Sequence, residues 1–382
     1  MDYVEHLEGG TRLLVPQVSL TRDPPPTSPV FFNPAASLNR DISVAVTAAL
    51  DGSSFCDSMS GVGARGIRVA REVGRIETVA LVDFNAEALR AGGRAAELNG
   101  VEGKCEFSYS ETSTYLYSKA GRGERFDFVD VDPFGTPVRQ LQAALSATAD
   151  GGLLSVTATD TAVLCGVYPR VCERRYGAAS MRSDFVHETG IRLLAGSIVR
   201  QGAQLDLGVR PVFAHSTRHY VRVFLRVSTG AAEADGSLEG IGYIQSCAHC
   251  GQLSTAATAQ TGCSSCGRKA RAAGPAWVRG LGDPEVLRRA RAAADEEGLT
   301  VASKAIASLE GTDDLPPWSF SIDAVSSALK VATVPESMVV KSLEDLGWKA
   351  KRTPFEKTGV KTDAPYGEFY RAIEGLRAKV RA

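Results

Sequence analysis

The chain has 382 residues, of which 44% are hydrophobic and 23% charged, so it predicts two or three domains that can each bury a core. The 43 Lys and Arg balance 44 Asp and Glu, which excludes a protein that is basic over its whole surface. There is no apolar run of about 18 residues and no basic and apolar leader, so we expect a cytoplasmic protein without a membrane partner.

In chain order, the first 40 residues are expected to form an irregular surface arm that contains several prolines and ends near Phe31. From residue 55 onward, short apolar strands alternate with Gly-rich turns and helical segments. This alternation predicts a doubly wound α/β domain with a largely parallel sheet. The expected strands cover residues 55–56, 78–82, 126–131, 153–157 and 221–227, the expected helices include 86–98 and 185–200, and 230–237 is expected to be a linker.

A nucleotide-binding turn is predicted at Gly61-x-Gly63-x-x-Gly66, directly after the first strand. Asp83 ends the second strand, where a carboxylate can accept hydrogen bonds from ribose hydroxyls. This pattern suits NAD, FAD and S-adenosylmethionine equally, and it also fits a plain turn between a strand and a helix. An NAD-dependent dehydrogenase therefore stays open on these residues alone.

The residues Asp132-Pro133-Phe134-Gly135 follow the strand expected at 126–131, at the edge of the sheet where the nucleotide would lie. A carboxylate that accepts an N–H from an exocyclic amine makes that nitrogen more electron-rich and takes up its developing positive charge. An aromatic ring can stack on the base and hold the nitrogen in line with a methyl donor. The pattern therefore predicts base N-methylation, for which a dehydrogenase would have no use.

Four cysteines form the array Cys247-x2-Cys250-x12-Cys263-x2-Cys266, and a glycine follows each pair. Four thiolates at this spacing are typical of a closed tetrahedral zinc site with a structural role. The alternatives are two disulfides or free thiols, and a non-enzymatic zinc-ribbon protein that binds nucleic acid also fits the array.

Two segments carry a local excess of basic residues, with ten arginines against four acids in 170–226 and ten basic residues against six acids from 341 onward. Such segments suit contacts to phosphates, although solvated helix or strand faces would look the same. Within the second segment, basic residues surround an aromatic residue, at Trp348, Lys349, Lys351, Arg352 and Lys361.

Taken together, these motifs resemble the tRNA (guanine-N2) dimethyltransferase family, which modifies guanine at tRNA position 26. The resemblance spans nearly the whole chain and depends most on Asp132-Pro133-Phe134-Gly135 and on Asn33-Pro34 followed by Asn39-Arg40-Asp41. Further matches are Gly61 to Arg68, Arg175-Tyr176-Gly177, the four cysteines, Gly274-Pro275-x-Trp277 and residues 359–365.

The resemblance implies a class I (Rossmann-like) S-adenosylmethionine-dependent methyltransferase domain with its N-terminal arm at 1–230, a zinc ribbon at 240–275 and a smaller α+β tRNA-binding domain at 276–382. It implies dimethylation of the N2 amine of a flipped-out guanine, with tRNA as partner and no protein partner evident. The implied catalytic residues are Asp132, Phe134 and Phe31, and the implied cofactor-binding residues are Arg40, Arg65, Asp83, Glu111 and Thr112. The family's Asp-Ala-Asn reads Glu111-Thr112-Ser113 here.

Overall fold

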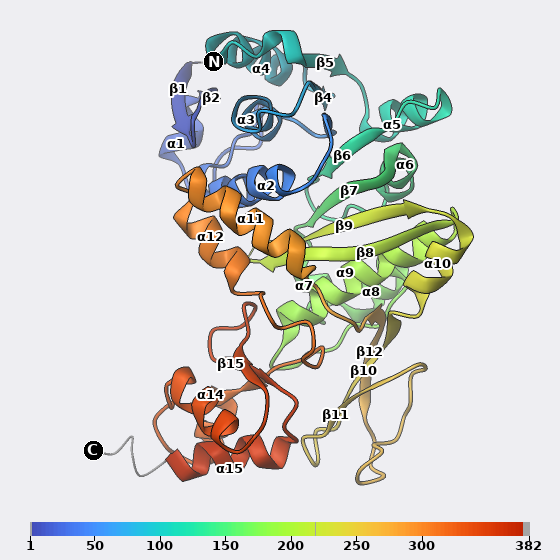
Figure 1. Ribbon diagram of the computed structural model, residues 1–382, viewed down its shortest axis with the longest axis vertical. Coiled ribbons are helices and arrows are strands. Elements are labelled where there is room, and N and C mark those ends of the chain that lie inside the picture. Colours follow the sequence, from blue (N-terminus) through green and yellow to red (C-terminus); the bar gives the residue numbers. More distant parts are fainter. Residues whose placement is uncertain (1, 218, 377–382) are drawn as a thin grey trace.

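The computed structural model describes residues 2–217 and 219–376, and its main feature is a seven-stranded sheet with helices on both faces (Figure 1). The five strands β3 to β7 are parallel, and β9 and β8 continue the sheet in antiparallel order. The predicted doubly wound α/β domain is therefore confirmed. In spatial order the strands are β5 (Cys105–Tyr109), β4 (Thr78–Asp83), β3 (Ser54–Asp57), β6 (Phe126–Val131), β7 (Thr148–Ala158), β9 (Val221–Thr229) and β8 (Leu207–Ser216).

The strand order reverses direction between β3 and β6, because β4 and β5 lie on one side of β3 while β6 and β7 lie on the other. The carboxyl ends of β3, β4 and β6 consequently meet at one edge, where α/β proteins bind their ligands. Two groups of helices cover the two faces, and Figure 1 shows α2 and α3 opposite α5 and α6. The groups are α2 (Ser37–Ala49), α3 (Ala64–Glu72) and α4 (Ala86–Asn99), and α5 (Thr112–Gly121), α6 (Leu141–Ala147) and α9 (Val186–Ala203).

The expectation of an irregular N-terminal arm is wrong for residues 3–16, which form an antiparallel hairpin of β1 (Tyr3–Glu8) and β2 (Thr11–Pro16). Glu8 pairs with Thr11, so Gly9 and Gly10 form a two-residue turn, and Gly9 has a φ of 56°. Gly-Gly between two strands is typical of a two-residue hairpin turn, but the prolines farther along the chain led to the expectation of an irregular arm. After α1 (Gln17–Thr21), residues 22–33 do run without helix or strand, to η1 (Pro34–Ala36).

The expected linker at 230–237 is also wrong, because α10 (Ala231–Leu238) is a helix that packs on β8 and α9. Farther on, α11 (Pro284–Glu296) and α12 (Thr300–Ala307) pack on α2, and their apolar side chains join the core of the large sheet. The division of the chain at 230, 240 and 275 stays a prediction.

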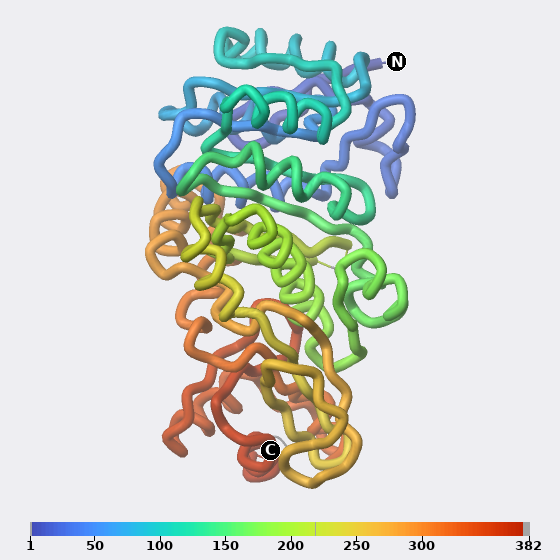
Figure 2. Tube along the Cα trace, turned by 90° about the vertical axis from the view of Figure 1, so that its right-hand side faces the viewer, coloured from blue at the N-terminus to red at the C-terminus, as the bar shows by residue number. Residues whose placement is uncertain are grey.

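The cysteine segment and the C-terminal segment lie side by side at the end of the molecule opposite the N-terminal hairpin (Figures 1 and 2). The first is a three-stranded sheet in which β10 lies between β11 and β12. The second, here called the C-terminal unit (residues 318–376), has its own small core, against which Leu253 of β11 packs. The elements are β10 (Ile241–Ser246), β11 (Leu253–Ala256), β12 (Arg271–Trp277), β13 (Phe320–Ser321), α13 (Ile322–Ala328), α14 (Glu336–Asp345), β14 (Ala350–Arg352), β15 (Gly359–Thr362) and α15 (Tyr366–Leu376).

A buried ion pair joins the C-terminal unit to α9. Lys361 of β15 is 1% exposed, and its Nζ lies 2.5 Å from a carboxylate oxygen of Glu188, which also binds Arg192. Burial lowers the pKa of Lys361 to about 8, although Glu188 opposes the shift. Lys361 is therefore a structural residue in this fold, and its predicted contact with phosphate is excluded by its burial. In the described part of the chain, no helix has the length and apolarity needed to cross a bilayer.

Candidate active site

The carboxylate of Asp132 lies one residue past β6, at the reversal point of the sheet, and its side chain is 30% exposed. Arg65, in the first turn of α3, donates to Asp132 through one terminal nitrogen and lies 3.2 Å from Asp130 through Nε. Burial opposes ionisation of Asp132, but the charges of Arg65 and Arg222 outweigh it and hold the pKa of Asp132 below its usual range. Asp132 is thus an accessible, ionised hydrogen-bond acceptor.

Behind this carboxylate is a second ion pair that the sequence analysis missed. Arg222 of β9 is fully buried and donates to Asp130, which is 1% exposed, and to the Thr157 hydroxyl at 2.6 Å. Arg222 belongs to the basic segment 170–226, for which phosphate contacts and a solvated strand face were the two interpretations. Neither applies to Arg222, because helices cover both faces of this sheet and the side chain is buried. Thr157 pairs with Arg222 across β7 and β9, so a polar row runs from the end of β6 into the sheet. The alternation of apolar and basic residues in this strand did not indicate the ion pair, because a solvated strand face has the same pattern.

Two side chains beside the row fix the geometry of Arg65. The guanidinium donates to Asn39 Oδ1 at 2.8 Å and to Ser43 Oγ at 2.5 Å, both on α2. Asp57, the last residue of β3, accepts the backbone N–H of Gly66 at 2.9 Å. Burial raises the pKa of Asp57 to about 7, although Arg65 opposes this. Arg65 is therefore held between α2 and the strand ends, and it in turn orients Asp132.

Two aromatic rings lie in contact at the mouth of the site. They belong to Phe31 and Phe134, the two residues that the family resemblance implied for contact with the base. Phe134 is 68% exposed, and its ring contacts Phe31 edge to face, with centroids 4.8 Å apart and planes at 73°. A base stacked between two rings needs about 7 Å between them, as two van der Waals contacts of roughly 3.5 Å. The two rings must therefore separate before a base can lie between them.

The glycine turn and Asp83 form the second half of the site. Gly63 is the N-cap of α3 and has a left-handed φ of 77°, and Gly61 has a φ of 53°. Both positions of this turn therefore favour glycine. Asp83 accepts the backbone N–H of Gly61 and of Asn85, each at 2.8 Å. The neighbouring Phe84 is 78% exposed, an aromatic surface beside the carboxylate that the sequence analysis did not single out.

Arg40 and Arg65, the two arginines expected to bind the cofactor, both contact protein carboxylates. Arg40 of α2 donates to both carboxylate oxygens of Glu8, at 2.6 and 2.5 Å, and its guanidinium lies 5.0 Å from the centroid of the Phe32 ring. A charged ligand at either arginine would have to share it with Glu8 or Asp132.

Glu111 and Thr112 lie at the start of α5, and each makes a structural contact. Glu111 is the N-cap and accepts the backbone N–H of Thr114 at 2.8 Å. Burial raises the pKa of Glu111, but the N–H groups of Ser113 and Thr114 outweigh it, so the net shift is downward. Thr112 is buried and donates to the Ser58 carbonyl at 2.7 Å. Of the two, only Glu111 has a side chain exposed to a ligand.

These residues fit S-adenosylmethionine. A Cβ at Gly61 would meet only the Phe31 carbonyl, at 3.8 Å, so the turn leaves open space beside Asp83. Asp83 and the arginines offer acceptors for ribose hydroxyls and donors for a carboxylate, the groups that this cofactor presents.

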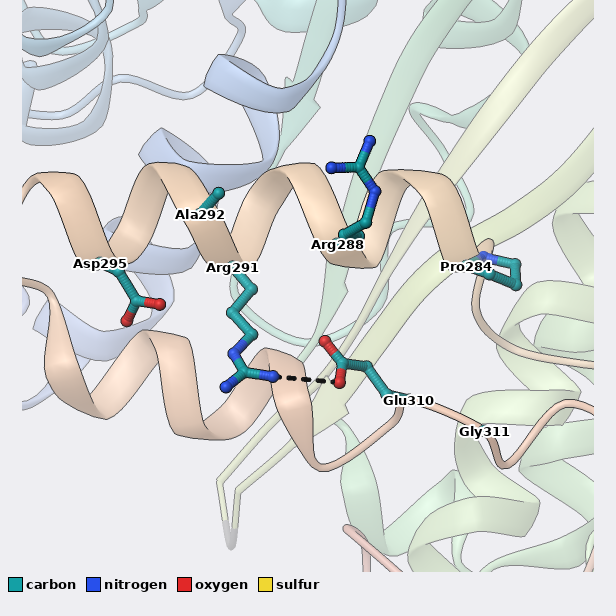
Figure 3. A pocket seen from close by; sticks show the side chains of 7 residues that line it. All are labelled: Pro284, Arg288, Arg291, Ala292, Asp295, Glu310 and Gly311. Atoms are coloured by element: carbon teal, nitrogen blue, oxygen red, sulfur yellow. Dashed lines mark hydrogen bonds and ion pairs between the residues drawn. The ribbon is translucent and has the colours of Figure 1, made fainter.

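A separate hollow of about 500 Å³ lies along α11 and the residues after α12, and Figure 3 shows its walls. Arg291 lies 3.3 Å from Glu310 across it, so charges of its wall pair with each other. None of the expected site residues lines it: the lining is Pro284, Arg288, Arg291, Ala292, Asp295, Glu310 and Gly311.

The four cysteines of the array converge on one point. Their sulfur atoms all lie within 4.8 Å of one another, and the pairs Cys247–Cys266 and Cys250–Cys263 are each 3.6 Å apart. A disulfide would need about 2.05 Å, whereas a tetrahedron with Zn–S bonds of about 2.3 Å needs roughly 3.8 Å between sulfurs. The residues therefore fit a structural zinc ion with no position open for a substrate.

Replacing Cys263 with serine should remove this metal and destabilise the ribbon, while the large sheet keeps its cofactor affinity. Metal analysis should find about one zinc per chain in the wild type and none in the variant. Cys105→Ser is the matched control, because Cys105 lies outside the cluster and should keep the zinc. Purified protein with two disulfides and no metal would contradict the assignment.

Comparisons with known proteins show the family to which this chain belongs. The model of the family described as "N2,N2-dimethylguanosine tRNA methyltransferase" matches residues 9–374. Among relatives, the tRNA (guanine(26)-N(2))-dimethyltransferase of Methanothermobacter thermautotrophicus is 33% identical over 97% of this chain and 98% of its own. The enzyme of the same name from Methanopyrus kandleri is 36% identical over 95% and 94%.

A solved structure, the complex of Trm1 from Pyrococcus horikoshii with S-adenosyl-L-methionine, superposes with a TM-score of 0.85. It is 31% identical and covers 97% of this chain and 99% of its own. The match to the family model covers far more than half of the sequence, and the relatives match along nearly their full length. The chain belongs to the N2,N2-dimethylguanosine tRNA methyltransferase family.

Proposed function

We propose that this protein dimethylates the exocyclic N2 amine of guanine 26 in tRNA, with S-adenosylmethionine as methyl donor. The observation that carries the proposal is an ionised, accessible carboxylate, Asp132, beside the exposed ring of Phe134 at the reversal point of the sheet. A hydride-transfer enzyme has no need of this pair, and a non-enzymatic zinc-ribbon protein has no need of the nucleotide turn.

The carboxylate acts on an amine whose lone pair is delocalised into the guanine ring. Asp132 accepts an N–H of N2, which makes the nitrogen more electron-rich, and it takes the proton that the nitrogen loses as the N–C bond forms. When bound, S-adenosylmethionine supplies an electrophilic methyl group. Arg65 keeps Asp132 ionised and oriented, and Asp83 and Arg40 would hold the ribose and carboxylate ends of the cofactor.

The target base must leave the tRNA stack to reach this site. Phe31 and Phe134 would then separate and hold the base between them, so that N2 lies against Asp132. The zinc ribbon and the C-terminal unit would support the tRNA. We place the reaction in the cytoplasm, where thiolates of a structural zinc site stay reduced.

The test is nucleoside mass spectrometry of tRNA transcripts treated with the enzyme and S-adenosylmethionine. We expect N2,N2-dimethylguanosine in a transcript with guanine at position 26 and none in the matched transcript with adenine there. Unmodified guanine 26, or equal methylation of both transcripts, would overturn the proposal.

Phe31→Ala should lower tRNA methylation while leaving the melting temperature and cofactor affinity near those of the wild type. The ring is only half-buried and contacts the exposed Phe134, so its loss removes a base contact of roughly 1–3 kcal/mol. Phe32→Ala is the contrasting control, because Phe32 is 3% exposed and its truncation should cost about 3–5 kcal/mol of stability. Early unfolding of Phe31→Ala with normal methylation at low temperature would make Phe31 a packing residue.

A further inference from the structure

We propose that α8 (Pro169–Tyr176) binds phosphate groups of the tRNA backbone next to the target nucleotide. The inference rests on the proposed tRNA methylation and assigns part of the substrate-binding surface. It accounts for the Arg175-Tyr176-Gly177 motif, which the catalytic mechanism leaves without a role. Three observations support it. Hydrogen bonds connect α8 to the loop that carries Phe134, two arginines of α8 form no ion pair with the described residues, and several basic residues of the C-terminal unit, the other candidates for phosphate contacts, already have partners.

Hydrogen bonds connect α8 to the loop that carries Phe134, by way of Thr159 and Asp160. Gly135 donates its N–H to the Thr159 hydroxyl at 2.6 Å and accepts the backbone N–H of Thr159 at 2.8 Å. The next residue, Asp160, accepts the Tyr176 hydroxyl at 2.6 Å and pairs with Arg175 at 2.9 Å. Two hydrogen-bonded steps therefore connect the catalytic loop to the last turn of α8, which fixes the helix beside the mouth of the site.

The solvent-facing side of α8 carries two arginines that form no ion pair with the described residues. Arg170 and Arg174 are exposed one turn apart, so their side chains lie on one face. In the ranges that the structure describes, neither makes an ion pair, whereas Arg175 is held by Asp160. Tyr168, just before the helix, is 55% exposed and offers a ring beside the two arginines.

Several basic residues of the C-terminal unit differ from those of α8, because their charged groups already contact acceptors in the protein. Arg352 lies 2.9 Å from Glu336, Lys349 lies 3.8 Å from Asp314, and Lys351 donates to the Glu310 carbonyl at 3.0 Å. A phosphate would compete with these partners. At Arg170 and Arg174 it would meet no ion pair with the described residues, and only a 3.4 Å hydrogen bond from Arg174 to the Arg170 carbonyl.

The charge and position of α8 suit a polyanion whose base enters the site. The phosphates that flank a base held at Phe134 belong to its own and the adjacent nucleotides, so they would lie at the rim of the site, outside the pocket that holds the splayed-out base. A planar guanidinium can bind a phosphate through two parallel N–H···O bonds. We therefore assign these two arginines to the backbone on either side of guanine 26.

The experiment compares the double variant R170A/R174A with R90A/R94A, a matched pair of exposed arginines one turn apart on α4. Figure 1 shows α4 and α8 at opposite ends of the sheet. We measure tRNA binding as a function of salt, affinity for S-adenosylmethionine, and KM and kcat for methylation. We expect R170A/R174A to raise the Kd and KM for tRNA by on the order of tenfold, and to reduce the slope of log Kd against log salt by about 2, one for each lost contact.

Cofactor affinity should stay unchanged in both variants, and R90A/R94A should bind tRNA as the wild type does. Equal tRNA affinities and salt slopes for the two double variants would overturn the assignment to α8. An equal loss of tRNA affinity in both double variants would also overturn the assignment, because the loss would then follow from the lower positive charge of the protein and not from the position of α8. These binding measurements do not depend on turnover, so failure of the wild type to methylate tRNA would instead count against the proposed function.

Discussion

Asp132→Asn should lower kcat for tRNA methylation by on the order of 10²-fold or more. The asparagine keeps the shape of the side chain and one acceptor oxygen, but it cannot take up the proton or the positive charge that develops on N2. Affinity for S-adenosylmethionine should stay near normal, and calorimetric titration measures it independently of turnover. Near-normal kcat in this variant would eliminate the proposed mechanism.

The pH dependence of this carboxylate follows from its neighbours. Because Arg65 and Arg222 hold the pKa of Asp132 below its usual range, the group stays ionised as pH falls toward about 4, the ordinary value for an aspartate. Activity should therefore not be lost through Asp132 until pH falls below that value. Arg65→Met removes the nearest positive charge and should move the acidic limb of the profile to higher pH.

Arg222→Met should destabilise the fold by about 3–5 kcal/mol, because it leaves Asp130 buried without its closest positive partner. Urea denaturation monitored by fluorescence measures this loss. The double variant Arg222→Met, Asp130→Asn should recover part of the stability, since the unpaired charge is then gone.

Arg226→Met is the control for this result, because Arg226 lies on the same strand, is half-buried and should change stability by no more than about 0.5 kcal/mol. Equal losses for Arg222→Met and Arg226→Met would show that the buried pair has no special role. Because Asp130 also contacts Arg65, Arg222→Met should further lower kcat by loosening the support of Asp132.

The parts of the fold that were predicted from sequence are those encoded by local pattern. The strands that end at Asp83 and Val131, the glycine turn and the two cysteine pairs each depend on residues a few positions apart. The position of the Asp132-Pro133-Phe134-Gly135 loop at the reversal point of the sheet could be predicted because a strand end fixes where the next residues lie.

The features that the sequence analysis missed depend on contacts between residues that are far apart in the chain, so no short stretch of sequence contains both partners. Arg222 and Asp130 are separated by 92 positions, and Lys361 and Glu188 by 173. A basic residue in an alternating strand looks solvated until its acidic partner is known, so burial of Arg222 and Lys361 could not be inferred from either segment alone. The contact between Phe31 and Phe134 was suggested only by the family resemblance, and its edge-to-face geometry needed coordinates.

The link between α9 and the C-terminal unit has a consequence for how the chain can be divided. Neighbouring residues at the start of α9 both reach that unit, since His187 pairs with Glu356 at 2.9 Å and Glu188 pairs with Lys361. A fragment cut before residue 318 would lose both partners and leave the fully buried carboxylate of Glu188 to Arg192 alone. We therefore expect that the large sheet and the C-terminal unit do not fold as independent parts, and that a recombinant fragment ending before residue 318 would need Glu188 replaced by an uncharged residue.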